Sequence, residues 1–142
     1  RRAPQDEQIA RLMTIPGVGA LTATAFVGAV PDIHGFRNAR QFSSWLGLTP
    51  REHSSGNTRQ LGSISKRGNV HLRTLLIHGA RSALLAAKRL ANNGKPLNSL
   101  QRWALALQER AGHNKATVAL ANRMARVIWA MWVREANYDA TR

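Results

Sequence analysis

Apolar residues recur every three or four positions over two long stretches of this sequence, and this spacing constrains the fold more than any other feature. The stretches cover residues 69–91 and 114–135. Such spacing places the apolar side chains on one face of an α-helix. The pattern therefore predicts two long helices that pack through one face each. Their expected buried positions are Leu72, Leu75, Leu76, Ala83, Ala87 and Leu90 in the first, and Ala121, Met124, Ile128, Met131 and Trp132 in the second.

Shorter helices are expected over residues 5–14, 20–30, 39–46 and 99–111. Pro31 can end the second of them, and Asn69 is a plausible N-cap for the helix over 69–91. The sequence predicts an all-α fold in which residues 1–142 form a single domain, with 69–137 as a helical bundle around one core. No apolar stretch approaches the roughly 18 residues that a membrane span requires.

The charge of the chain is strongly unbalanced. Twenty-one Lys and Arg residues stand against seven Asp and Glu, which gives a net charge of +14. No acidic residue lies between Glu52 and Glu109, so this region cannot neutralise itself through internal ion pairs. Arginine, which forms bidentate contacts with phosphate, supplies most of the positive charge. The balance favours a nucleic-acid partner over a merely solvated basic surface or an anionic membrane surface.

Residues 12–30 read Leu-Met-Thr-Ile-Pro-Gly-Val-Gly followed by a second helical stretch, and they resemble a helix-hairpin-helix motif. Gly17 and Gly19 would allow positive φ angles and a close approach of the backbone to phosphate. The amides from Val18 to Leu21, at the start of the second helix, would point at the anion. The alternative is an ordinary helical hairpin whose glycines serve packing. The order and spacing favour contact with the DNA backbone, which carries no base specificity.

Residues 47–68 are expected to form a long basic loop that carries two adjacent serines, Ser54 and Ser55, beside Gly56. A serine hydroxyl is a weak nucleophile unless a base activates it or cations stabilise the developing charge. The loop suits attack on a phosphodiester, and equally a serine that only hydrogen-bonds a phosphate. The cations expected to bind nucleic acid here are Arg59, Lys66, Arg67 and Arg73.

The stretch from Gly47 to Gly56, with Ser-Lys-Arg-Gly at 65–68 and the run from His71 to Ala80, resembles the C-terminal serine domain of the bridge-RNA-guided DEDD insertion-element transposases. The resemblance implies site-specific DNA strand exchange, with Ser55 as the nucleophile and Ser54 as the alternative. It implies duplex DNA and a guide RNA as partners, assembly of several protomers, and a bacterial, cytoplasmic, nucleoid-associated protein. It also implies that a DEDD nuclease domain, absent from this chain, supplies Mg²⁺ and half of the active site, so that the isolated chain is inactive.

Metal binding and base stacking by this chain itself are not expected. The five histidines have no neighbouring cysteine, and the few carboxylates are not clustered, so no metal site and no cofactor are predicted here. His53, two residues before Ser55, could orient a hydroxyl or simply be an exposed loop residue. Most of the tryptophans lie on predicted helical stripes and are expected in the core. The competing interpretation of function is a non-catalytic helix-hairpin-helix module that only holds DNA; an RNA-binding scaffold fits the charge but not the hairpin turn.

Overall fold

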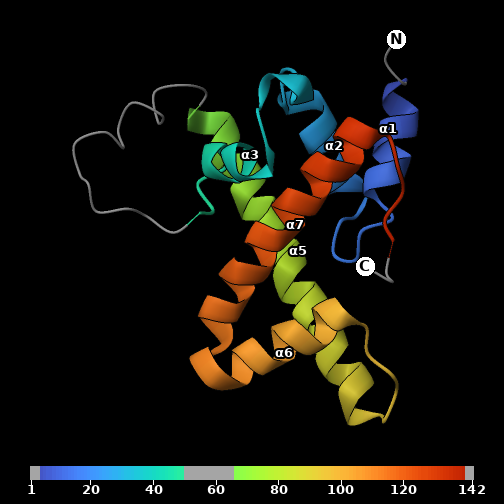
Figure 1. Ribbon diagram of the computed structural model, residues 1–142, viewed down its shortest axis with the longest axis vertical. Helices are drawn as coiled ribbons and strands as arrows, with labels where there is room; N and C mark the ends of the chain where they lie inside the picture. The colour runs from blue at the N-terminus through green and yellow to red at the C-terminus, as the bar shows by residue number, and fades with distance from the viewer. Residues whose placement is uncertain (1–3, 50–65, 140–142) are drawn as a thin grey trace, which may run out of the picture.

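The computed structural model describes residues 4–49 and 66–139, and within these ranges it consists of helices and turns without a strand (Figure 1). The predicted all-α fold class is confirmed. The helices are α1 (Gln5–Leu12), α2 (Ala20–Ala29), the short 3₁₀ helix η1 (Ile33–Gly35), α3 (Ala39–Trp45), α5 (Lys66–Asn92), α6 (Ser99–Ala111) and α7 (His113–Arg134).

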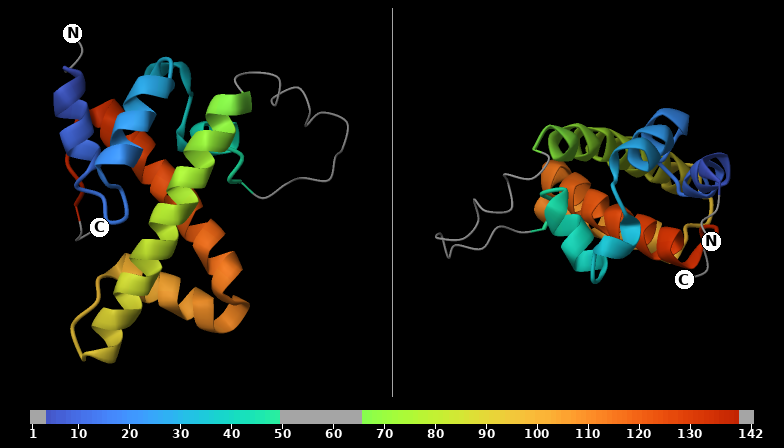
Figure 2. Two further views of the ribbon diagram at one scale, coloured as in Figure 1. Left: turned by 180° about the vertical axis from the view of Figure 1, so that it is seen from behind. Right: turned by 90° about the horizontal axis from the view of Figure 1, so that it is seen from above.

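The two longest helices, α5 and α7, cross each other and organise the fold (Figures 1 and 2). At one end of the crossing, α6 packs against both of them. At the other end, α1 and α2 pack against each other, α2 lies against α5, and α3 lies against α7. Seen from above, α2 and α3 lie on different sides of the crossed pair (Figure 2, right). All these helices share one buried apolar cluster.

Helix α7 supplies the centre of the core. All five positions that its periodicity predicts to be inside are buried: Ala121, Met124, Ile128, Met131 and Trp132. From the other helices, Leu12, Phe26 and Phe42 are fully enclosed. Phe42 also contacts three aromatic neighbours, with Phe36 edge-on at a centroid distance of 5.1 Å, Trp45 stacked at 6.1 Å and Phe26 tilted at 6.3 Å. Such pairs add stabilisation beyond the burial of their area.

The buried face of α5 differs from the predicted one. Its enclosed residues follow a spacing of mostly four positions: Leu72, Leu76, Ala80, Leu84 and Ala87. Rows of side chains four residues apart are the ridges with which crossing helices commonly interdigitate. Leu75, Ala83 and Leu90, predicted to be inside, are only half-buried at the margins of this row. The prediction identified the helix and three of these positions, but it set the face slightly off the row that meets α7.

The start of α5 corrects another prediction. Helix α5 begins at Lys66, so Asn69 is an interior helical position and not the N-cap, and residues 66–68 are helical where a loop was expected. Asn favours caps because its side chain competes with backbone hydrogen bonds, but Lys and Arg are good helix formers. The helical preference of the residues before Asn69 therefore outweighs the capping preference of Asn69, and the helix begins about one turn earlier.

Candidate nucleic-acid interface

The helical hairpin consists of α1 and α2, joined by residues 13–19. Gly17 adopts the positive φ expected of it, at +92°. Gly19 does not: it is the N-cap of α2 with φ −93° and ψ −174°, an extended conformation that any residue can adopt. The expectation of a positive φ is therefore wrong at Gly19, because the chain turns at Gly17 and enters the helix from an extended residue.

The close backbone approach at Gly17 is made to the protein itself. A Cβ atom placed on Gly17 would come 2.6 Å from the carbonyl oxygen of Gly79 in α5 and 3.0 Å from Cε of Met124 in α7. Packing against α5 and α7 therefore explains why a residue without a side chain stands at position 17. The contact fixes the hairpin turn against the middle of α5.

The open side of the turn lies at the start of α2. The side chain of Val18 is buried, and its amide donates to the carbonyl of Ile15 at 3.0 Å, so the expectation that this amide faces an anion is wrong. A Cβ atom placed on Gly19 would meet no atom within 4 Å, and the N-terminus of α2 has no side-chain cap. The first amides of a helix lack intrahelical acceptors. Beside them Leu21 is 73% exposed, a surface residue that periodicity gave no reason to single out.

Of the predicted basic loop, the serines Ser54 and Ser55 and the cation Arg59 lie outside the described residues. Lys66 and Arg67 begin α5. At such a position the amides of the first helical turn contribute partial positive charge along with the two cations.

Arg73 joins the two helices that flank residues 50–65. Its guanidinium Nη1 donates to the carbonyl of Leu46, at the C-terminal end of α3, at 3.1 Å. Gly47 follows with φ +79°, and a side chain there would meet this guanidinium. Ser44 and Thr49 share a hydroxyl–hydroxyl hydrogen bond of 3.1 Å in the same turn. Arg73, predicted as a phosphate contact, therefore also holds α3 to α5, using one of its five N–H donors.

Most of the positive charge of the chain has no acidic counterpart, since 21 basic residues stand against seven acidic ones. Arg11 pairs with Glu7 at 3.4 Å in α1. Elsewhere basic residues lie exposed on every long helix, among them Arg81, Lys88 and Arg89 in α5, Arg102 and Arg110 in α6, and Lys115, Arg123, Arg126 and Arg134 in α7. This surface is suited to an extended polyanion.

Within residues 4–49 and 66–139, no group of three or more His, Cys, Asp or Glu residues could hold a metal ion. In the same part of the chain, no helix combines the length and the hydropathy needed to cross a membrane. The described residues thus present exposed cations and uncapped helix amides, which are groups that can contact phosphate.

Comparison with known proteins identifies the family. The sequence pattern described as the transposase IS116/IS110/IS902 family matches residues 9–94. This chain belongs to the IS116/IS110/IS902 transposase family. The matched part runs from α1 to the end of α5, so it includes the hairpin and residues 50–65. The expectation of an insertion-element transposase is confirmed at this level.

Individual relatives agree with the family assignment. The transposase for insertion sequence element IS1111A of Coxiella burnetii is 52% identical over 136 residues, which are 96% of this chain and 36% of that protein. A probable family 20 transposase of Pseudomonas aeruginosa is 45% identical over 94% of this chain and 38% of its own length. The pilin gene-inverting protein of Moraxella bovis is 38% identical over 66 residues, 46% of this chain and 20% of that protein. The chain spans about a third of the length of the first two transposases.

Proposed function

We propose that this chain is the DNA-binding, serine-bearing part of an insertion-element transposase that catalyses site-specific DNA strand exchange. The membership of the IS116/IS110/IS902 family carries the proposal. The net charge of +14 and the exposed arginines on α5, α6 and α7 support duplex DNA as the partner. The relatives, two transposases and a gene-inverting protein, are by name proteins that rearrange DNA.

The hairpin is the proposed contact with the DNA backbone. The amides at the start of α2 and the exposed Gly19 would receive a phosphate, while Gly17 and Val18 hold the turn in the conformation that presents them. Helix N-termini bind anions through these amides and through the helix dipole. If Gly19 were replaced by a larger residue, the new side chain would stand between the backbone and the phosphate, although no atom of the protein itself would clash with it.

Ser55 is the proposed nucleophile, and Ser54 is the alternative. The serine Oγ would lose its proton and attack the phosphorus of a phosphodiester, the bond from phosphorus to the sugar oxygen of one strand end would break, and this released oxygen would take up one proton in exchange. The result is a phosphoserine ester that conserves the energy of the broken bond for rejoining. Arg59, Lys66, Arg67 and the remaining N–H groups of Arg73 would stabilise the extra negative charge of the transition state.

The other two-thirds of the transposase would supply what this part lacks. The resemblance implies a DEDD nuclease domain that binds Mg²⁺, a guide RNA and a homo-oligomeric assembly in the bacterial nucleoid. For this reason the isolated chain is expected to bind DNA without recombining it.

The serine proposal is tested in the full-length transposase with matched alanine variants. Ser55→Ala is expected to abolish the covalent protein–DNA adduct on denaturing gels and to abolish recombination, while DNA binding stays within about twofold. Ser54→Ala, which removes the neighbouring hydroxyl, is the control and should retain the adduct. If the adduct persists in Ser55→Ala and is lost in Ser54→Ala, the nucleophile is Ser54. An adduct or recombination that survives in both variants contradicts a serine mechanism and leaves a non-catalytic DNA-binding module.

A further inference from the structure

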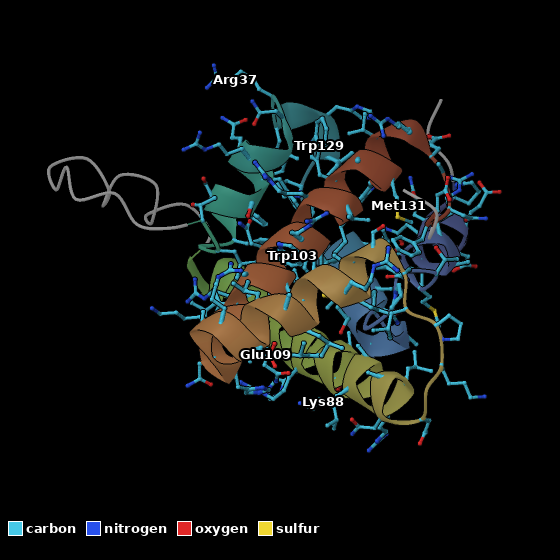
Figure 3. All side chains as sticks on the ribbon, turned by 60° about the horizontal axis from the view of Figure 1, so that its bottom comes forward. Arg37, Lys88, Trp103, Glu109, Trp129 and Met131 are labelled. Carbon is cyan, nitrogen blue, oxygen red and sulfur yellow. The ribbon has the colours of Figure 1, made fainter. Side chains whose placement is uncertain are left out.

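An open groove of about 580 Å³ lies between α6, α7 and the residues that follow α7. Its floor is apolar and includes Leu100, Val127 and Met131. Figure 3 shows α6 and α7 on this side of the molecule, with Trp103 and Met131 labelled. The third wall is the chain after α7, whose position is fixed because the amide of Tyr138 donates to Oγ1 of Thr14 at 2.9 Å.

Two arginines of α7, Arg123 and Arg134, line this groove. The guanidinium carbon of Arg123 lies 4.6 Å from the centroid of the Trp103 ring, a cation–π contact that orients the side chain. A guanidinium that stacks through its face still presents N–H groups around its edge. Asp139 also lines the groove, so the two arginines leave it with a net positive charge.

Polar groups for recognition come from the third wall. Asn137 and Tyr138 line the groove beside the arginines. Burial raises the pKa of Tyr138 above its ordinary value; the nearby positive charge of Arg123 opposes this effect and Asp139 adds to it. The phenol therefore stays protonated at neutral pH and can donate a hydrogen bond. An amide and a phenol can pair with the edge of a nucleobase, which an aliphatic floor cannot do.

We propose that this groove binds a short stretch of unpaired DNA, with its phosphates on Arg123 and Arg134 and its bases on the apolar floor. An apolar surface flanked by arginines matches the chemistry of a single strand, whose flat bases and charged backbone are both accessible. In a duplex the bases are stacked and paired inside, so the floor would have no partner. An acidic peptide, the alternative occupant of a positively charged groove, would not require the apolar floor.

The spacing of the arginines sets the length of the bound strand. Arg123, Val127, Ala130 and Arg134 follow one another along one side of α7, and the 11 residue steps from Arg123 to Arg134 rise about 16 Å. A stacked strand rises about 3.4 Å per nucleotide. The groove therefore accommodates at most about five nucleotides, and fewer where the bases are unstacked.

This inference deepens the proposed function, because a protein that exchanges DNA strands must hold DNA that is locally unpaired. The inference about the groove can nevertheless be tested separately from the proposed function. Duplex binding is assigned to the hairpin and to the basic surface as a whole, of which Arg123 and Arg134 are only two of many cations, whereas the groove lies between α6, α7 and the final residues. The two assignments can fail independently.

The test is a fluorescence-anisotropy titration of the 142-residue chain with labelled oligo-dT of eight nucleotides and with a 20-base-pair duplex. Arg123→Gln is compared with Arg126→Gln, a matched control that removes the same charge from an exposed position of α7 that does not line the groove. Ala130→Trp fills the groove without changing the charge. If Ala130→Trp does not fold, Arg134→Gln is used in its place. Circular dichroism verifies folding.

We expect Arg123→Gln and Ala130→Trp to weaken oligo-dT binding about tenfold or more, and Arg126→Gln to weaken it less than threefold. Duplex affinity should fall by the same small factor in Arg123→Gln and Arg126→Gln, because each variant removes one of the many cations of the basic surface. Equal effects of these two variants on oligo-dT would overturn the groove assignment, whatever the duplex result. An oligo-U of the same length that binds tenfold more tightly would overturn its assignment to DNA. If the unsubstituted chain binds oligo-dT but does not bind the duplex, this result would instead contradict the proposed function of the hairpin.

Discussion

The contact between the hairpin and α5 can be tested by adding a single methyl group. In Gly79→Ala, the new Cβ would overlap the carbonyl oxygen of Gly17, which is a backbone atom that a rotamer change cannot remove. Forcing an extra methyl group into a packed contact typically costs about 1–3 kcal/mol, more where backbone has to move. Alanine is also the better helix former by about 1 kcal/mol, and this gain acts in the opposite direction.

The net expectation is that Gly79→Ala lowers the free energy of unfolding by about 1–2 kcal/mol. For a domain of this size that corresponds to a fall of roughly 3–8 °C in the melting temperature. Gly28→Ala is the matched control, because Gly28 is also helical but is exposed, with no atom within 4 Å of the added Cβ. That variant should gain up to about 1 kcal/mol. Thermal and urea unfolding followed by circular dichroism measure both. A Gly79→Ala protein at least as stable as the parent would refute a tight Gly17–Gly79 contact.

Three further variants test separate parts of the fold. Asn122→Ala should cost about 1–3 kcal/mol in urea unfolding, because the fully buried hydroxyl of Ser43 donates to the Asn122 side chain and would lose its acceptor; an unchanged midpoint would contradict this bond. Asn98→Ala should cost about 0.5–2 kcal/mol, since Asn98 and Gln101 form a reciprocal capping box at the start of α6, and Asn98→Ser, which keeps a capping oxygen, should recover most of it. Gly19→Val should lower the melting temperature by only a few degrees, the cost of a poorer N-cap, but weaken duplex binding severalfold at low salt, and equal affinity would remove this turn from the DNA interface.

Helical periodicity predicted the elements well because it is a local property of the chain. The face of α7 was predicted correctly at every position named, since that helix packs on several neighbours and its whole apolar stripe is covered. On α5 the covered row depends on how α5 crosses α7, and the sequence does not contain that angle. Asn69 shows the same limit at smaller scale, because a good capping residue inside a longer helix has the same local signal as one at its start.

Tertiary partners of the candidate site could not be predicted from the motifs. The motif predicts that Gly17 lets a phosphate approach the backbone, yet a Cβ atom placed on it would meet the carbonyl oxygen of Gly79, 62 positions along the chain. Arg73 is predicted to contact phosphate, yet its guanidinium donates a hydrogen bond to the carbonyl of Leu46. Both residue types serve either role, and only the packing of distant segments decides between them. The roles of Ser54 and Ser55 rest on resemblance and chemistry and stay predictions.

The central position of α7 has a consequence for how the polypeptide acquires its structure. This helix contacts α1, η1, α3, α5 and α6, and the bond from Ser43 to Asn122 closes a loop of 79 residues. Contacts so distant in sequence slow folding relative to other helical proteins. During synthesis, the surfaces of α3 and α5 that pack on α7 stay uncovered until the ribosome has released residues beyond 113. The family pattern ends at residue 94, so the region by which this transposase is recognised is shorter than the unit that folds.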